Sequence, residues 1–170
     1  MKKLSFILAF ALASGLAASA QAKSVYTSTK TSACRTISSH PDEAGSYEGE
    51  CLGVGGYKVR LIEGDIRQTL DIISPTKKKS ELKLWEMFPS FSAVGEKLEW
   101  RTKGGVPFAL IFRYYVADPS GGKGSQYLFV TKLGKSSSCI VDIVDPMAKQ
   151  NEKARELADA SAGKPCKSRE

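Results

Sequence analysis

The chain has 170 residues, and its 25 lysines and arginines outnumber 18 aspartates and glutamates, for a formal net charge of +7. This length suits a single domain with a real hydrophobic core. The positive charge is spread along the chain apart from Lys77-Lys78-Lys79, and no nucleic-acid-binding motif occurs, so we do not expect nucleic acid as a partner.

The first 22 residues have the layout of a secretory signal peptide. Two lysines precede an apolar run from Leu4 to Ala20, and Ala20-Gln21-Ala22 matches a small-x-small cleavage site. The strongly apolar part, Leu4 to Ala13, is shorter than the roughly 20 residues that a membrane span needs. We therefore expect cleavage near Ala22 and a single secreted domain at residues 23–170, without a membrane span, in the periplasm or outside the cell.

A β-hairpin is the clearest element of the first half. Before it, the Ser/Thr-rich stretch from residue 23 to 46 offers only a short strand near Val25-Tyr26, and residues 46–51 favour another strand. The hairpin strands are residues 57–63 and 66–72, joined by Gly64-Asp65, which suits a type II′ turn. The predicted register separates an apolar from a polar face, with these pairs: Val59 with Leu70, Tyr57 with Ile72, Lys58 with Asp71, and Arg60 with Thr69. It leaves two poor pairs, Leu61 with Gln68 and Ile62 with Arg67.

The sequence is ambiguous between this hairpin and the next clear strand. Ser74-Pro75-Thr76 and the three lysines predict a loop. Residues 81–87 fit either a strand or one to two helical turns. Residues 97–102 then predict a strand with Leu98 and Trp100 on one face.

The last third predicts three strands and a helix. Residues 107–117 are apolar on both faces, which is typical of a central strand covered on both sides. Residues 126–133 and 138–144 favour two more strands. Asp145 as N-cap and Pro146 as the first residue predict a helix that ends at Gly163. The fold class is therefore α+β: a mostly antiparallel, meander-like sheet of about six to eight strands, with the C-terminal helix packed on it.

Four cysteines, Cys34, Cys51, Cys139 and Cys166, lie after the predicted cleavage site. An even number in an oxidising compartment implies structural disulfides, and four cysteines allow three pairings. We favour Cys34–Cys51 and Cys139–Cys166, because each closes a local loop near one end of the chain. A metal site is not expected, because no C-x-x-C occurs and the only histidine, His40, lies in a polar loop. We expect no cofactor either.

Several short motifs resemble those of a group of small secreted proteins from alphaproteobacteria, to which no activity is attached. They are Cys51-x-Gly-x-Gly-Gly-Tyr-x-Val, Glu63-Gly-Asp-x-Arg67, Glu99-Trp-Arg101, Pro107-Phe-Ala and Val130-Thr-Lys-Leu-Gly134, followed by the cysteine-ended helical tail. The resemblance covers most of the mature chain. It implies a location outside the cytoplasm and a fold type, and it assigns no catalytic residue.

Two hypotheses about function follow. The preferred one is a non-enzymatic periplasmic binding or interaction module, a monomer that binds an anionic ligand or a protein partner. Its candidate surface combines basic and aromatic residues, Lys77, Lys78, Trp85 and Phe88, in one exposed patch. The alternative is a small hydrolase or other enzyme, in which Arg67, Arg113 and an acidic residue converge in a pocket. No catalytic or metal-binding residue is assigned.

Overall fold

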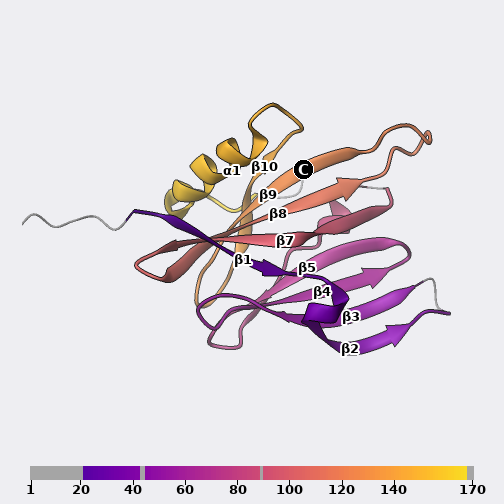
Figure 1. Ribbon diagram of the computed structural model, residues 1–170, viewed down its shortest axis with the longest axis horizontal. Helices are drawn as coiled ribbons and strands as arrows, with labels where there is room; N and C mark the ends of the chain where they lie inside the picture. The colour runs from indigo at the N-terminus through magenta and orange to yellow at the C-terminus, as the bar shows by residue number, and fades with distance from the viewer. Residues whose placement is uncertain (1–20, 43–44, 89, 168–170) are drawn as a thin grey trace, which may run out of the picture.

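The computed structural model describes residues 21–42, 45–88 and 90–167 (Figure 1). The predicted signal peptide therefore lies almost entirely outside the described residues. Within these ranges the chain forms ten strands and one α-helix: β1 (Lys23–Ser28), β2 (Cys34–His40), β3 (Ser46–Leu52), β4 (Lys58–Gly64), β5 (Arg67–Ile73), β6 (Lys79–Glu81), β7 (Ser92–Lys103), β8 (Val106–Val116), β9 (Ser125–Lys132), β10 (Cys139–Val144) and α1 (Gln150–Asp159).

The strands form one mostly antiparallel sheet in meander order, which confirms the predicted fold class. The order is β10-β9-β8-β7-β5-β4-β3-β2, with β1 on β7 and β6 on β5. The sheet exceeds the expected six to eight strands because the Ser/Thr-rich segment before residue 46 supplies the edge strand β2, and β6 is only three residues long.

One parallel bridge, Arg67 to Ser92, joins β5 to β7 at a corner of the sheet. Beyond it the two strands part, and β5 continues along β6 while β7 continues along β1. The bridge divides the sheet into two halves, one that contains β4 and β5 and one that contains β7 and β8. The main core contains buried residues from both halves, such as Leu61 and Ile72 from the first and Trp100 and Phe112 from the second. The two halves therefore face each other across a shared core.

A second, smaller core lies between the helix and the opposite face of β8–β10. Ala154 and Ala158 of α1 pack there with Ile111, Val130 and Val141. The α1 ribbon lies beside this end of the sheet (Figure 1). Strand β8 is therefore covered on both faces, as predicted for residues 107–117.

The register of the β4–β5 hairpin differs from the prediction by two residues in each pair. The turn residues are Asp65 and Ile66, both with positive φ, rather than Gly64 and Asp65, which indicates a type I′ instead of a type II′ turn. The two faces are unchanged. The observed register removes both poor pairs, because Leu61 now pairs with Leu70, Ile62 with Thr69, and Glu63 with Gln68.

The predicted helix start and end are wrong by several residues. The helix begins at Gln150, not Pro146, and Lys149 precedes it with φ 59°. The Gln150 side-chain amide donates to the carbonyls of Val144 and Asp145, so these groups are bonded without a helix between residues 145 and 149. At the other end α1 stops at Asp159, and a separate short 3₁₀ turn ends at Gly163.

Both favoured disulfides are present. Cys34–Cys51 links β2 to β3, and Cys139–Cys166 ties the C-terminal tail to β10. No helix in the described ranges is long and apolar enough to cross a membrane.

Candidate functional site

The basic and aromatic residues singled out in the sequence lie in separate places. Lys77 and Lys78 are exposed on the loop between β5 and β6. Lys77 lines one pocket with Lys58 and Arg60, whereas Trp85 lines another with Ile62 and Asp71. Phe88 packs against Tyr114, Tyr127 and Phe129, with ring centroids 4.7–6.2 Å away.

Trp85 is half-buried, and its pocket contains a buried carboxylate. Asp71 is 3 % exposed, and burial raises the pKa of its carboxyl group despite the Lys79 ammonium 3.5 Å away. Lys79 is closer to Glu81, at 2.8 Å. The positive charges around Trp85 are therefore largely matched by acidic neighbours.

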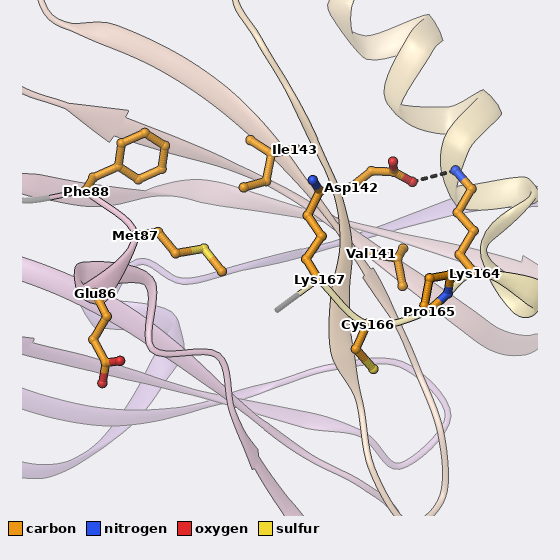
Figure 2. A pocket seen from close by; sticks show the side chains of 10 residues that line it. All are labelled: Glu86, Met87, Phe88, Val141, Asp142, Ile143, Lys164, Pro165, Cys166 and Lys167. Atoms are coloured by element: carbon orange, nitrogen blue, oxygen red, sulfur yellow. Dashed lines mark hydrogen bonds and ion pairs between the residues drawn. The ribbon is translucent and has the colours of Figure 1, made fainter. Parts of the chain in front are cut away.

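Phe88 lines a pocket of about 610 Å³. Figure 2 shows Met87 and Phe88 on one side of it, and Ile143 and the C-terminal tail on the other. Lys164 of the tail forms an ion pair with Asp142, and both residues belong to the wall of this pocket. Its lining is about equally polar and apolar, and it gives no clear preference for one class of ligand.

Arg67 and Arg113 do not converge on one pocket. Arg67 forms an ion pair with Asp65 at 2.8 Å, beside the β4–β5 turn. Arg113 lies on the helix side of β8 and donates to three amide oxygens: Gln150 at 2.8 Å, Asn151 at 3.2 Å and Gln126 at 3.4 Å.

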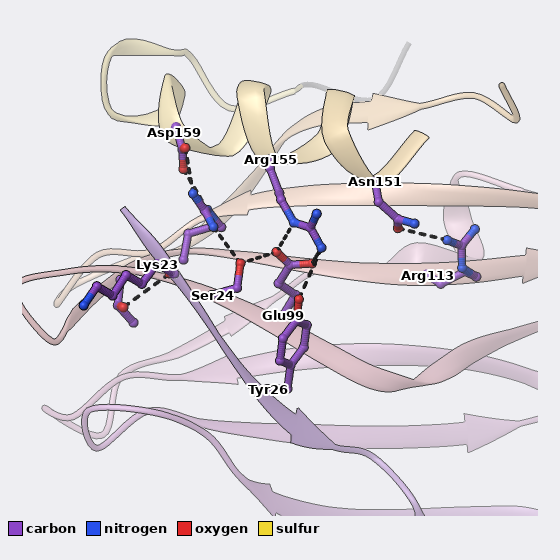
Figure 3. A network of polar contacts seen from close by, with 10 residues as sticks. Lys23, Ser24, Tyr26, Glu99, Arg113, Asn151, Arg155 and Asp159 are labelled. Carbon is purple, nitrogen blue, oxygen red and sulfur yellow. Dashed lines mark hydrogen bonds and ion pairs between the residues drawn. The ribbon is translucent and has the colours of Figure 1, made fainter. Parts of the chain in front are cut away.

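A polar network holds β1 and α1 against β7 (Figure 3). The buried Glu99 carboxylate accepts from Arg155 at 2.6 and 3.1 Å, and from the Ser24 hydroxyl. Arg101, also buried, binds both carboxylate oxygens of Asp159 at 2.7 and 2.8 Å and donates to Ser24. These carboxylates raise the pKa values of both guanidinium groups. The network joins the N-terminal strand, the sheet and the C-terminal helix.

A pocket of about 540 Å³ opens next to this network, where β7 bulges away from β8 between Val94 and Leu98. We call it the bulge pocket; it is lined chiefly by Tyr26, Ala93, Lys97, Glu99, Arg113, Tyr115 and Asn151. Gly95 forms part of the bulge, and a Cβ there would lie 3.0 Å from the Arg113 Cβ. Glycine therefore lets Arg113 lie close against β7. Bulges of this kind commonly redirect side chains next to functional sites.

An apolar cleft of about 490 Å³ lies beyond the bulge pocket, at the end of the sheet. We call it the terminal cleft; its main lining residues are Ile66, Phe91, Ala93, Tyr115, Val116 and Lys123. Three of these are large and exposed: Ile66 by 57 %, Phe91 by 54 % and Tyr115 by 42 %. Exposed apolar side chains that gather in one hollow mark sites of interaction more often than isolated ones do.

Backbone hydrogen bonds between three chain segments form this cleft. The β4–β5 turn, the residues before β7 and the β8–β9 loop gather at one end of the sheet, on the right in Figure 1. The Ser92 amide donates to the Ile66 carbonyl at 3.2 Å, and the Ala117 amide donates to the Phe91 carbonyl at 2.9 Å. The rigid sheet therefore fixes the relative positions of Ile66 and Phe91.

Ile66 has a costly backbone conformation. Its φ is 56°, in the left-handed region that β-branched residues rarely adopt. This conformation costs roughly 1–2 kcal/mol in a residue other than glycine. The exposed side chain recovers little of that cost within the chain. Strain of this kind is typical of positions with a functional role.

Few features of the sequence point to this cleft. The sequence predicts Ile66 as the first residue of a strand rather than as a turn residue. The useful signal was Asp65-Ile66 at the centre of a hairpin, where Asn-Gly or Asp-Gly is the ordinary pair. The described residues contain no cluster of three or more histidine, cysteine or acidic side chains that could hold a metal ion.

In comparisons by sequence and by structure, no family model, curated protein or solved structure matched this chain.

Proposed function

We propose that this protein is a non-enzymatic binding module that works outside the cytoplasm and holds the apolar part of its ligand in the terminal cleft. The observation that carries the proposal is the convergence of Ile66, Phe91 and Tyr115, each more than two-fifths exposed, on one apolar hollow. Burial of such side chains is the main favourable term in most binding reactions.

The geometry of the polar groups favours binding over catalysis. In the bulge pocket the Glu99 carboxylate accepts from Arg155 and Ser24, and Ser24 in turn accepts from Arg101. A general base must be able to accept a proton from its substrate. Glu99 and Ser24 are instead occupied in joining β1 and α1 to β7.

The extracytoplasmic location is supported by the two disulfides and by the signal-peptide pattern of residues 1–22. Disulfides persist mainly in oxidising compartments.

Methyl NMR with selective labelling tests the proposal without knowledge of the ligand. The mature protein is titrated with an extract of the extracytoplasmic fraction of the organism that naturally produces it. The methyl signals of Ile66 and Val106 are followed. Val106 is a matched control, since it is 67 % exposed and does not line the terminal cleft. We expect the Ile66 signals to shift, the Val106 signals to stay, and Phe91→Asp to abolish the shift. Equal shifts at both residues, or none at Ile66, would refute the proposal.

A further inference from the structure

The terminal cleft and the bulge pocket are two parts of one surface. Both are lined by Ala93 and Tyr115, which pair across β7 and β8. Arg113, two residues before Tyr115 in β8, points to the same face of the sheet and lines the bulge pocket. An apolar hollow therefore continues, past one exposed tyrosine, into a pocket that contains a guanidinium group.

Arg113 differs from the two other arginines on this side of the sheet. Arg101 binds the carboxylate of Asp159, and Arg155 binds that of Glu99. Arg113 contacts only neutral amide oxygens and forms no ion pair with any carboxylate in the described ranges. These amides hold the guanidinium in place without neutralising its charge. A guanidinium in a partly covered site favours a bidentate carboxylate or phosphate as counter-ion.

The two carboxylates of the bulge pocket do not neutralise Arg113. Glu99 is bound by Arg155, and Glu96 forms an ion pair with Lys30 at 3.2 Å. Lys97 lies 5.4 Å from the centre of the Tyr26 ring. A cationic ligand group would be repelled by Arg113 and Lys97, because both nearby carboxylates are already paired. An anionic group would instead find the guanidinium of Arg113 without a counter-ion.

We propose that the ligand is a single-chain anionic amphiphile. Its hydrocarbon chain lies in the terminal cleft against Ile66 and Phe91, and its carboxylate or phosphate group pairs with Arg113 across Tyr115. This inference rests on the proposed function, because it names the ligand class of the same cleft. It adds a charge preference that the apolar cleft alone does not require.

Isothermal titration calorimetry with amphiphiles of equal chain length tests this inference. The mature protein is titrated with tridecanoate, dodecyl phosphate and dodecyltrimethylammonium, whose alkyl chains have the same number of carbons, each below its micelle concentration. We expect the two anions to bind at least about tenfold more tightly than the cation, since a desolvated charge pair contributes on this scale. The tighter of the two anions identifies the headgroup as a carboxylate or a phosphate.

Variants of the charged residues locate the headgroup. Arg113→Gln should weaken binding of the anions by about tenfold and remove the preference for anions over the cation. Arg113→Lys, which keeps the charge, should retain part of this preference. Lys103→Gln is the matched control, because Lys103 is an exposed lysine of β7 that lines neither the bulge pocket nor the terminal cleft. If Arg113→Gln leaves the preference unchanged, or Lys103→Gln removes it as well, the assignment to Arg113 is wrong. Thermal unfolding of each variant checks that the fold is intact.

The outcomes separate this inference from the proposed function. If the anions and the cation bind equally well, the charge preference is wrong but the cleft still binds amphiphiles. If no amphiphile binds while the host extract still shifts the Ile66 methyl signals, the ligand class is wrong and the binding function stands. If neither the amphiphiles nor the extract affects Ile66, both proposals fail.

Discussion

At the scale of single residues, Ile66 connects backbone strain with the terminal cleft. Its left-handed conformation and its exposed side chain are both unfavourable in the free protein. Both become understandable if the side chain is buried by a ligand, since the binding energy then offsets the strain.

We predict that Ile66→Gly stabilises the protein by about 1 kcal/mol and weakens ligand binding. Glycine adopts positive φ without steric cost, and the change creates the Asp-Gly pair that type I′ turns favour. Urea unfolding measures the first effect, and calorimetric titration with dodecanoate measures the second. Unchanged binding in a stabilised variant would show that Ile66 has no part in the site.

Asp71 gives a second residue-scale prediction, on pH. Burial raises the pKa of its carboxyl group in the folded protein above the ordinary value of 3.8. The folded state therefore holds this proton more tightly than the unfolded state does. Stability is highest below the unfolded pKa and falls as the pH rises through the raised, folded pKa.

Asp71→Asn removes this loss, so we expect the variant to be more stable than wild type at neutral pH. The difference should vanish below about pH 4, where the wild-type carboxyl group is protonated in both states. Thermal unfolding across this pH range provides the measurement. Glu81→Gln is the control, because Glu81 is an exposed neighbour whose pKa is lowered by Lys79. An Asn variant less stable than wild type at neutral pH would show that the Lys79 contact outweighs burial.

At the scale of elements, two arginines of the polar network anchor α1 on the sheet. The helix has few large apolar residues, and its buried positions are mostly small, such as Ala154 and Ala158. Its attachment therefore depends on Arg155 with Glu99 and on Arg101 with Asp159 more than on hydrophobic contact.

We predict that Arg155→Met lowers the free energy of unfolding by about 2 kcal/mol, because it leaves the buried Glu99 carboxylate without its cation. Lys153→Met on the same helix is the control. It breaks the exposed Lys153–Glu156 pair and should change stability by less than about 0.5 kcal/mol. Equal effects of the two variants in urea unfolding would mean that the network does not anchor the helix.

The sequence predicted most elements but not their ends. The separation of apolar and polar faces identified β4 and β5, and an almost continuous apolar run identified β8, which is covered on both faces. The predicted hairpin turn lies one residue too early, at Gly64-Asp65 instead of Asp65-Ile66. Favourable cross-strand pairs along the whole hairpin outweigh the preference of glycine for the turn. Edge strand β2 has few apolar residues and gave no periodic signal. The helix start depended on a tertiary contact, the Gln150 amide bonds, that no local pattern contains.

The candidate site was less predictable than the fold. Lys77, Trp85 and Phe88 are close in sequence, but the chain turns through β6 and a 3₁₀ helix between them, which sends them to different pockets. The terminal cleft instead joins Ile66, Phe91 and Tyr115 from three distant segments. Arg113, which interrupts the apolar strand β8, lies beside this cleft, in the bulge pocket.

At the scale of the whole molecule, two disulfides secure the two ends of the sheet. Cys34–Cys51 joins the edge strand β2 to β3, and Cys139–Cys166 closes a segment that includes all of α1, across a sequence separation of 27. Both the helix and the tail are thereby tied to the strands that form the second core.

We expect the double change Cys139→Ala with Cys166→Ala to lower the free energy of unfolding by about 3.5 kcal/mol, as loop-closure entropy predicts for a loop of this length. Urea unfolding under non-reducing conditions measures the change. A loss below about 0.5 kcal/mol would mean that the helix and its network hold the tail without the covalent bond.

Binding of an anionic amphiphile by the terminal cleft together with Arg113 can be tested by native, non-reducing mass spectrometry. The protein is purified without detergent from the organism that naturally produces it, and spectra are recorded before and after addition of dodecanoate. We predict a chain with two disulfides that retains a small anionic ligand, which dodecanoate displaces. Phe91→Ser should abolish retention, and Val106→Ser should not. A wild-type chain that carries no ligand, even with excess dodecanoate, would show that the terminal cleft does not bind anionic amphiphiles.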